Sequence, residues 1–232
     1  MHRAERAIIL AAGKGERMRP VTERTPKPLV PVQGSRMIDT IITALRENGI
    51  TEIYVVVGYH KEQFASLPEQ YPGLTLIENP DYASANNISS LYYARAHLEN
   101  TVILDGDQII RDPEILHPDF DRSGYCCRWT ESDTREWLLT VEDGVVTACS
   151  RTGGRKGWEL HSVSFWSAED GARLRGHLEQ EYESGNREIF WDDVALFCHP
   201  AAYRLGIRPM DDGALMEIDS FEELCALDPA YR

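Results

Sequence analysis

The stretch "RAIILAAGKGERMRPVTERTPKPLVPV", residues 6–32, decides the fold and points to the kind of ligand. A short apolar run followed by glycine is typical of a buried strand that ends in a loop. The basic residues Lys14, Arg17, Arg19 and Lys27 then follow. Glycines with basic neighbours indicate a phosphate-binding loop. This one has neither the third glycine of G-x-G-x-x-G nor the G-K-[ST] ending of a P-loop.

The net charge of the chain is −14, which argues against general nucleic-acid binding. The charge is unevenly distributed. Residues 1–36 hold eight lysines or arginines against three glutamates, a net of +5, so the remainder carries −19. Positive charge gathered around one loop focuses the electric field there. We therefore predict a local anion site at this loop.

The composition is that of a globular protein with room for a full core, since 42% of the residues are apolar. No apolar run approaches the ~18 residues of a membrane span, and "AIILAA" is short for the apolar region of a signal peptide. The five cysteines include no C-x-x-C pair, so neither a zinc knuckle nor a disulfide framework is expected. We expect free thiols, a cytoplasmic location, and neither a membrane nor a nucleic acid as partner.

The first half of the chain alternates strand and helix patterns, which predicts βαβ units. Such units form a largely parallel sheet whose ligand loops lie at one edge. Asn87 or Ser89 is expected to cap the third helix. Pro68 is expected to end the second. The expected strands are 7–12, 52–59, 74–79 and 101–107, and the expected helices are 37–49, 61–67 and 88–99.

The second half changes to short strand-like stretches, with "EDGVV" typical of a hairpin turn. We predict a single domain, 1–232, in which 1–120 form the nucleotide-binding half and 121–232 the acceptor-binding half and closing elements. The predicted fold class is α/β: a Rossmann-like, mostly parallel mixed sheet with helices on both faces, plus a small antiparallel substrate-binding part. The expected strands are 124–130, 136–143, 145–152, 160–167 and 214–220, and the expected helices are 168–185 and 221–228.

Two pairs of carboxylates are spaced i and i+2 at the ends of predicted strands. Asp105 and Asp107 form one pair, and Glu217 and Asp219 the other. Alternate residues of a strand point to the same side, so each pair can present two carboxylates to one ligand. Hard oxygen ligands of this kind suit Mg²⁺, which takes its other ligands from water and phosphate. The alternative is that these are ordinary polar strand ends.

A lysine and a set of aromatic residues complete the pattern. Lys27 stands between two prolines that restrict the backbone and aim the side chain, so it can act as a point charge on phosphate. All five tryptophans lie in the second half, and carboxylates flank several of them in "WTESDTREW" and "EIFWDDV". Aromatic faces beside carboxylates bind cations, above all quaternary ammonium. The alternative is a set of core aromatics with solvated acids.

Together these features resemble the nucleotidyltransferase family of nucleoside-triphosphate-dependent pyrophosphorylases. The resemblance continues through "GYHKEQF", "NPDYASANNISSLYYA", "LDGD", "TREWLL", "SVSFW", "FWDD" and "MEIDS", and it covers nearly the whole chain. In this arrangement the sequence is most similar to bacterial CTP:phosphocholine cytidylyltransferases. The family signature, G-x-G-x-R-x-x-P and then a Pro-Lys pair, is complete as Gly13, Gly15, Arg17, Pro20, Pro26 and Lys27.

The resemblance implies a Mg²⁺-dependent in-line transfer of CMP from CTP to phosphocholine, which gives CDP-choline and pyrophosphate. It assigns catalytic roles to Arg17, Lys27 and Asp107. The implied metal ligands are Asp107, Asp219 and Glu217. The implied nucleotide-binding residues are Leu10, Ala11, Ala12, Gly13, Lys14, Gly15, Arg17, Tyr82, Asn87, Ser89 and Asp105. The implied acceptor-binding residues are Glu131, Trp137, Phe190, Trp191 and Asp192, with phenylalanine at position 190 where relatives carry tyrosine.

Three other functions compete with this one. The same transfer could use another acceptor: phosphoethanolamine, 2-aminoethylphosphonate or a sugar 1-phosphate. A sugar site calls for many hydrogen-bonding groups, so the aromatic residues favour a cationic head group. A catalytically inactive nucleotide-binding regulator is disfavoured because Lys27, Asp107 and Asp219 are all present, and a dinucleotide-binding oxidoreductase because the third glycine is missing. The expected partners are small-molecule substrates, and no stretch predicts an oligomer interface.

Overall fold

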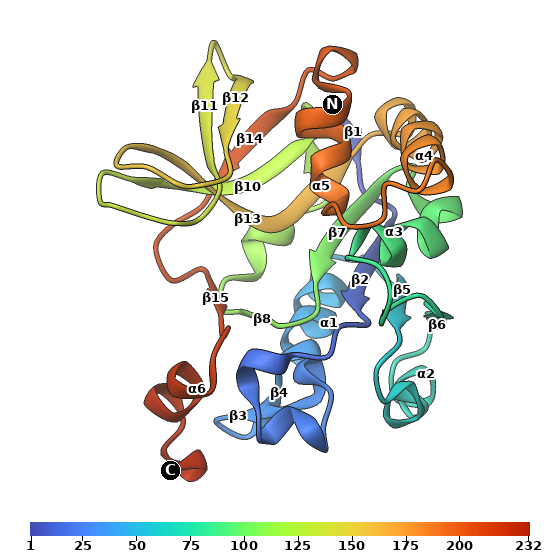
Figure 1. The fold of residues 1–232 in the computed structure, drawn as a ribbon, viewed down its shortest axis with the longest axis vertical. Coiled ribbons are helices and arrows are strands. Elements are labelled where there is room, and N and C mark those ends of the chain that lie inside the picture. Colours follow the sequence, from blue (N-terminus) through green and yellow to red (C-terminus); the bar gives the residue numbers. More distant parts are fainter.

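A nine-stranded sheet that draws strands from both halves of the chain forms the centre of the computed structural model, which describes residues 1–232. Seven strands run in the order β12–β11–β13–β7–β2–β5–β6, while β10 pairs with β13 and β14 (Figure 1). The strands of this sheet are β2 (Arg6–Ala11), β5 (Glu52–Val57), β6 (Leu74–Glu78), β7 (Thr101–Asp105), β10 (Gly124–Thr130), β11 (Leu138–Glu142), β12 (Val145–Ser150), β13 (Gly157–Trp166) and β14 (Gly206–Pro209).

Within the large sheet, the strands of the first half pair with one another in parallel, and those of the second half pair mainly antiparallel. β2 lies between β5 and β7, and β5 pairs with β6, each pair parallel. The long strand β13 joins the two parts. Residues Val163–Trp166 pair antiparallel with β7, whereas the beginning of the strand pairs with β11. The predicted mixed α/β sheet is confirmed.

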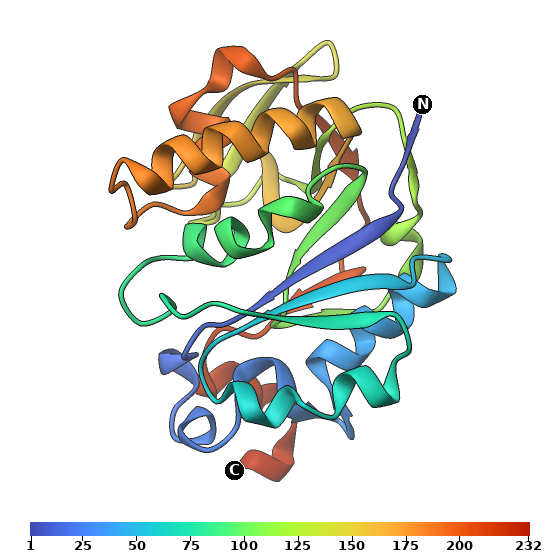
Figure 2. The same cartoon turned by 90° about the vertical axis from the view of Figure 1, so that its right-hand side faces the viewer.

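Helices cover both faces of the parallel strands, as Figure 2 shows (α3 and α4 on one side, α1 and α2 on the other). Alternate residues of β2 explain this arrangement. Ala7 and Ile9 belong to the buried cluster that includes α1, while Ile8 and Leu10 belong to the cluster that includes α3 and α4. A strand buried on both faces reads as a continuous apolar run. The helices are α1 (Met37–Glu47), α2 (Leu67–Gln70), α3 (Ile88–Ala94), α4 (Ala168–Glu183), α5 (Trp191–Asp193) and α6 (Phe221–Leu227).

Three two-stranded sheets complete the fold. β8 (Gln108–Ile110) pairs antiparallel with β15 (Leu215–Glu217), and this pairing brings the end of the chain back to the residues that follow β7. β1 (His2–Arg3) pairs with β9 (Asp119–Phe120), and β3 (Pro31–Val32) pairs with β4 (Ser35–Arg36). α6 packs beside β3 in a third buried cluster. The C-terminal segment therefore lies close to the glycine-bearing loop.

Some predictions of turns and helix ends from the local sequence are confirmed, and others are wrong. The "EDGVV" turn forms as predicted, with positive φ at Asp143 (48°) and Gly144 (72°), the geometry of a tight hairpin turn. Pro68 does not end a helix. It stands in the first turn of α2, where the missing N–H of proline costs nothing. The helix expected over 88–99 is shorter, since α3 ends at Ala94 and a 3-10 turn, Arg95–His97, follows.

Two further observations concern helix length and thiols. No helix of the structure has the combined length and apolar character that a membrane crossing needs. All five cysteines are free thiols, and Cys126 and Cys127 are buried in β10.

Candidate active site

Two adjoining cavities open at the carboxyl edge of the parallel strands. The first, of about 370 Å³, lies over the loop that follows β2. The second, of about 250 Å³, lies between the end of β7 and the antiparallel part. Because ligands of open α/β sheets bind at this edge, the two cavities are the candidate nucleotide and acceptor pockets. Both are lined by Arg17, Asn87, Asp105, Asp107 and Asp219.

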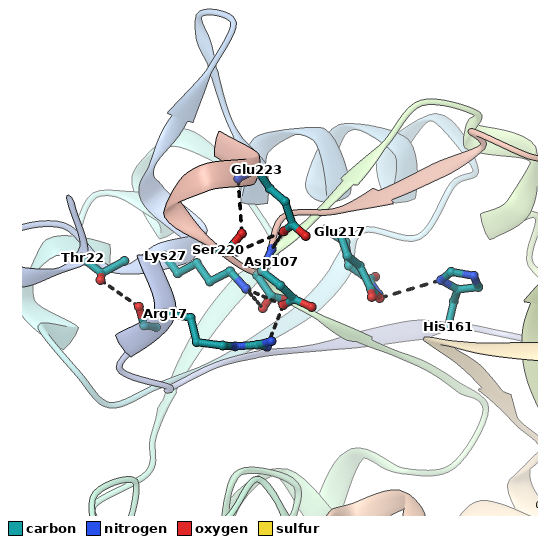
Figure 3. A network of polar contacts seen from close by, with 11 residues as sticks. Arg17, Thr22, Lys27, Asp107, His161, Glu217, Ser220 and Glu223 are labelled. Carbon is teal, nitrogen blue, oxygen red and sulfur yellow. Dashed lines mark hydrogen bonds and ion pairs between the residues drawn. The ribbon is translucent and has the colours of Figure 1, made fainter. Parts of the chain in front are cut away.

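Gly15 allows the loop after β2 to pack against Lys27. Its φ is 61°, in the left-handed region that favours glycine. A Cβ atom at this position would stand 3.0 Å from Cβ of Lys27 and 3.1 Å from Cγ2 of Thr22. The Thr22 hydroxyl also donates a hydrogen bond of 2.8 Å to the Gly15 carbonyl (Figure 3). The second glycine of the signature is thus required by packing, and the packing fixes the base of the lysine side chain.

Lys27 is a buried lysine held by two carboxylates. Its Nζ donates to Oδ2 of Asp107 at 2.6 Å and to Oδ1 of Asp219 at 3.1 Å, and Arg17 reaches the same Asp219 oxygen at 3.0 Å (Figure 3). Burial alone would lower the pKa of Lys27, but the two carboxylates raise it above its ordinary value. The lysine therefore stays an ammonium ion in the wall of the first cavity, next to two carboxylates that line both cavities.

Asp107 and Asp219 also fit the ligand set of a divalent cation. Both carboxylates contact the single Lys27 ammonium, so each has an oxygen within reach of the same positive group. Two carboxylate oxygens, with water and substrate phosphate for the remaining positions, are what Mg²⁺ commonly takes in phosphoryl-transfer sites. No group of three or more histidine, cysteine or acidic side chains forms a closed metal cage.

The N-terminus of α6 holds Asp219 in place. Oε2 of Glu223 accepts hydrogen bonds from the backbone N–H groups of Asp219 (2.6 Å) and Ser220 (3.0 Å), and Ser220 Oγ accepts from the Glu223 N–H (3.2 Å). This is a capping box. It fixes the backbone of a site residue that comes from the far end of the chain.

Glu217 and Asp105 lie beside this centre without contacting Lys27. Glu217 accepts a hydrogen bond of 2.8 Å from the Gln108 side chain, and one of its oxygens lies 4.0 Å from Nδ1 of His161. Burial, reinforced by Asp107, raises the pKa of Glu217 to about 7. Burial also raises the pKa of Asp105 well above its ordinary range, with Asp107 adding to the effect. Neither carboxyl has a lysine partner, in contrast to Asp107 and Asp219, which both pair with Lys27.

The acceptor pocket combines two aromatic rings with a buried carboxylate. The rings of Trp137 and Phe190 meet at 86° with centroids 5.7 Å apart. Asp192 is 7% exposed, and its Oδ1 has no hydrogen-bond partner. Burial raises the pKa of Asp192 to about 7. An unpaired buried carboxyl beside aromatic faces is suited to a cationic group that carries apolar surface.

Several residues predicted for the site lie elsewhere. Trp191 is 1% exposed and packs in the core against Tyr125 and Trp166, because it begins α5 with its ring turned inward. Glu131 is 68% exposed and forms an ion pair with Lys156, outside both cavities. Lys14, Tyr82 and Ser89 do not line the first cavity, whereas the other predicted nucleotide-binding residues, Leu10, Ala11, Ala12, Gly13, Gly15, Arg17, Asn87 and Asp105, do.

Two expectations about local contacts need correction. Asn87 does not cap α3 with its side chain. Its Oδ1 instead accepts a hydrogen bond of 2.9 Å from the Trp191 N–H, and Asn87 lines both cavities. The positive charge of residues 1–36 is also less concentrated than the sequence indicates, because many of its arginines pair with carboxylates outside the site. These arginines are Arg3, Arg6 and Arg36, while Arg19 pairs with Glu16, which lines the first cavity.

Other lining residues were missed from the sequence. Leu160 and Ser162 face the acceptor pocket from β13 at positions i and i+2, a spacing that strand alternation could have revealed. Glu136 lines the same pocket beside Trp137. The nucleotide pocket adds Glu16, Pro28 and Ser90, for which the sequence has no separate signal.

Comparisons with known proteins agree with this geometry. Residues 7–190 match the MobA-like NTP transferase domain family. A 2-aminoethylphosphonate cytidylyltransferase of Lancefieldella rimae is 42% identical over 97% of this chain and 92% of its own length. A choline-phosphate cytidylyltransferase of Streptococcus pneumoniae is 34% identical over 98% of both chains. The solved structure of CTP:phosphocholine cytidylyltransferase from S. pneumoniae superimposes with a TM-score of 0.90, 34% identity, and coverage of 99% of this chain and 100% of that one.

The fold, the loop after β2 and the extent of these matches define the protein as an enzyme of the nucleotidyltransferase class. The chain belongs to the MobA-like NTP transferase family. Enzymes of this family generally use a divalent metal ion, and the donor set at Asp107 and Asp219 fits one.

Proposed function

We propose that this protein transfers CMP from CTP to phosphocholine and releases pyrophosphate. The observation that carries the proposal is the second cavity. Trp137 and Phe190 stand at right angles beside the unpaired Asp192, and the same cavity reaches the phosphate-side residues Arg17 and Asp107. A trimethylammonium group matches aromatic faces and a carboxylate. The names of the S. pneumoniae relatives support this acceptor.

The reaction needs positioning and charge neutralisation more than acid–base chemistry. The acceptor phosphate is already ionised near neutral pH, so its oxygen can attack the α-phosphorus of CTP without a general base, and the bond to pyrophosphate breaks. Lys27 contacts the α-phosphate and the acceptor phosphate, while Arg17 binds the triphosphate. To contact phosphate, the Lys27 ammonium and the Arg17 guanidinium separate from their carboxylate partners. The Arg17 side chain is 72% exposed and can move readily.

We propose Mg²⁺ as the cation, with Asp107 and Asp219 as its protein ligands. When bound, it neutralises charge that develops on the phosphate oxygens. Glu217 accepts a hydrogen bond from Gln108 and forms part of the wall of the acceptor pocket. The base and ribose of CTP are bound by the loop Leu10–Gly13 and by Asn87.

The acceptor 2-aminoethylphosphonate is a second candidate, favoured by a specific observation. Oδ1 of the buried Asp192 has no donor in the structure, and a primary ammonium supplies donors that a trimethylammonium lacks. The name of the 42% identical L. rimae relative points the same way.

We further propose that the chain acts as a single domain in which residues 1–120 bind the nucleotide and residues 121–232 bind the acceptor. The continuous sheet across β13 and β7 supports the single domain. The second half also supplies closing elements, since Asp219 lines the nucleotide pocket. The five free thiols fit a reducing, cytoplasmic environment. Cell fractionation with an antibody tests the location.

Competition between acceptors tests the function. The purified protein, CTP and MgCl₂ are incubated with equal amounts of phosphocholine, phosphoethanolamine and 2-aminoethylphosphonate, and the products are followed by ³¹P NMR. We expect CDP-choline resonances and an equal amount of pyrophosphate. Faster formation of the phosphonate anhydride would select the second candidate. Tight CTP binding without any new diphosphate linkage would contradict both.

A further inference from the structure

Arg151 lies behind the acceptor pocket and joins two separate segments of the chain. It directly follows β12, in the segment that leads to β13. Its guanidinium forms an ion pair with Oδ1 of Asp193, a residue of α5. The Asp193 side chain is 4% exposed and that of Arg151 is 48% exposed. The arginine therefore covers the buried carboxylate on its solvent side. In Figure 1, β11, β12 and α5 belong to the same upper part of the molecule.

The same arginine contacts the aromatic wall of the pocket. Its Cζ lies 3.9 Å from the centroid of the Phe197 ring and 5.7 Å from that of Trp137. Trp137 in turn meets Phe197 and Phe190 at 86°, with centroids 5.6 and 5.7 Å apart. A planar guanidinium favours such stacking contacts. Arg151 thus holds Trp137 from the side of the β11–β12 hairpin.

Asp193 holds the other wall. Its Oδ2 accepts a hydrogen bond of 2.9 Å from the Phe190 N–H, and its own N–H donates to the Phe190 carbonyl at 3.1 Å. These bonds fix the backbone of Phe190 at the beginning of α5. The ion pair of Arg151 with Asp193 therefore connects the arginine that packs on Trp137 with the turn that bears Phe190.

We propose that Arg151 is a positioning residue for the acceptor, which fixes the spacing of Trp137 and Phe190 through its ion pair with Asp193. This inference rests on the proposed function, since it concerns the same acceptor pocket. Arg151 itself lines neither cavity, so it acts through the residues that it holds. Its loss should weaken the acceptor site and leave the nucleotide site intact.

The ion pair also determines which carboxylate is free for the acceptor. Asp192 and Asp193 are adjacent and both buried. Arg151 neutralises Asp193, whereas Oδ1 of Asp192 has no partner. The positive charge of the acceptor is therefore matched by Asp192 alone. Without Arg151, the buried Asp193 would lose its cationic partner directly beside Asp192.

Steady-state kinetics of Arg151→Met test the proposal. We expect KM for the acceptor to rise about tenfold, while KM for CTP stays within about twofold and kcat at saturating acceptor within about threefold. Arg151→Lys keeps the charge and should recover part of the loss. The matched control is Arg95→Met, because Arg95 also pairs with a carboxylate (Glu179, 2.9 Å) and stacks on a ring (Tyr92, 3.9 Å), and none of these residues lines either cavity. Its KM values should equal those of the wild type.

A substrate-free measurement separates this inference from the proposed function. Hydrogen–deuterium exchange of the segment 186–193 should be faster in Arg151→Met than in the wild type and unchanged in Arg95→Met. If the wild type uses none of the acceptors, the proposed function fails, and the exchange experiment still decides whether Arg151 holds this turn. Unchanged exchange, an unchanged acceptor KM, or equal increases of both KM values would each overturn the proposal.

Discussion

Lys27 shows how a single residue depends on its surroundings for its role. A surface lysine between two prolines has no special chemistry. Here Gly15 packs against its side-chain stem, and its ammonium is held by Asp107 and Asp219, which line both cavities. The carboxylates keep the pKa raised in spite of burial, so the group is always positive when phosphate arrives.

Replacing Lys27 with alanine should abolish most turnover. Loss of one preorganised charge in a transition state costs about 10²–10³ in kcat. The control is Lys61→Ala, which removes an exposed lysine that pairs with Glu78 away from both cavities. Initial rates of pyrophosphate release and a thermal melt check the result. A Lys27→Ala enzyme with wild-type kcat would show that the lysine is only structural.

Trp137 should determine acceptor affinity. We expect Trp137→Ala to raise KM for phosphocholine about tenfold, because a cation–aromatic contact of ~0.5–2 kcal/mol and its packing are lost. KM for CTP should change less than about twofold. Trp129→Ala is the matched control, since Trp129 is an exposed tryptophan that packs on Trp158 outside the pockets. Equal weakening of both substrates in Trp137→Ala would indicate a purely structural ring.

Asp192 should give the protein a characteristic pH dependence. Burial raises its pKa to about 7, so between pH 4 and 7 the native state binds a proton that the unfolded state has lost. The contribution of Asp192 to the free energy of unfolding is therefore full below its unfolded pKa and is lost as pH rises through 7. From pH 5 to pH 7 the wild type should lose on the order of 2 kcal/mol relative to Asp192→Asn.

Urea unfolding at pH 5, 6 and 7 measures this difference directly. Comparison with Asp192→Asn cancels the titration of the histidines, which is common to both proteins. Parallel pH profiles for the two proteins would contradict the account. In the wild type, KM for a cationic acceptor should also fall as pH rises through 7, because the ionised carboxylate binds the cation.

At the scale of elements, the beginning of α6 connects stability with the site. The capping box of Ser220 and Glu223 satisfies the N–H groups at the beginning of the helix, and the same Glu223 oxygen accepts from the Asp219 backbone. A short helix depends on such caps. The local sequence "DSFEE" therefore fixes the backbone of the second carboxylate, and the pairing of β8 with β15 brings that carboxylate to the site.

Glu223→Ala should impair both stability and cation use. We expect a loss of ~1 kcal/mol in the free energy of unfolding and a several-fold higher Mg²⁺ concentration for half-maximal rate. Glu222→Ala is the control, because this neighbouring glutamate makes no side-chain hydrogen bond. Urea unfolding and Mg²⁺ titrations of the rate give the two quantities. If the Mg²⁺ dependence is unchanged, the cap does not position Asp219.

Strands and turns could be predicted where a local sequence pattern determines them. Continuous apolar runs in the sequence indicate the buried strands β2, β5 and β7. The Asp-Gly pair indicates the turn at Asp143 and Gly144, where the backbone has positive φ. The role of Asn87 could not be predicted, because the donor for its side chain is the N–H of Trp191, more than a hundred residues away. The same holds for the inward turn of the Trp191 ring, which depends on Tyr125 and Trp166.

At the scale of the whole molecule, the sheet brings distant carboxylates to one edge. The pairing of β8 with β15 places Asp219 beside Asp107, and β13 carries the acceptor half onto β7. The i, i+2 spacing correctly indicated two acidic strand ends. It could not show that Asp219 contacts Lys27 whereas Glu217 pairs with Gln108, because this choice depends on the register of β8 and β15.

The initial rate of pyrophosphate release from CTP and Mg²⁺ tests the central claim most directly, with phosphocholine, 2-aminoethylphosphonate and glucose 1-phosphate as separate acceptors. The aromatic and carboxylate walls of the second cavity predict that kcat/KM for a cationic acceptor exceeds that for glucose 1-phosphate by at least about 100-fold, since a mismatch of ~3 kcal/mol corresponds to that ratio. Equal kcat/KM values for glucose 1-phosphate and phosphocholine would contradict the account.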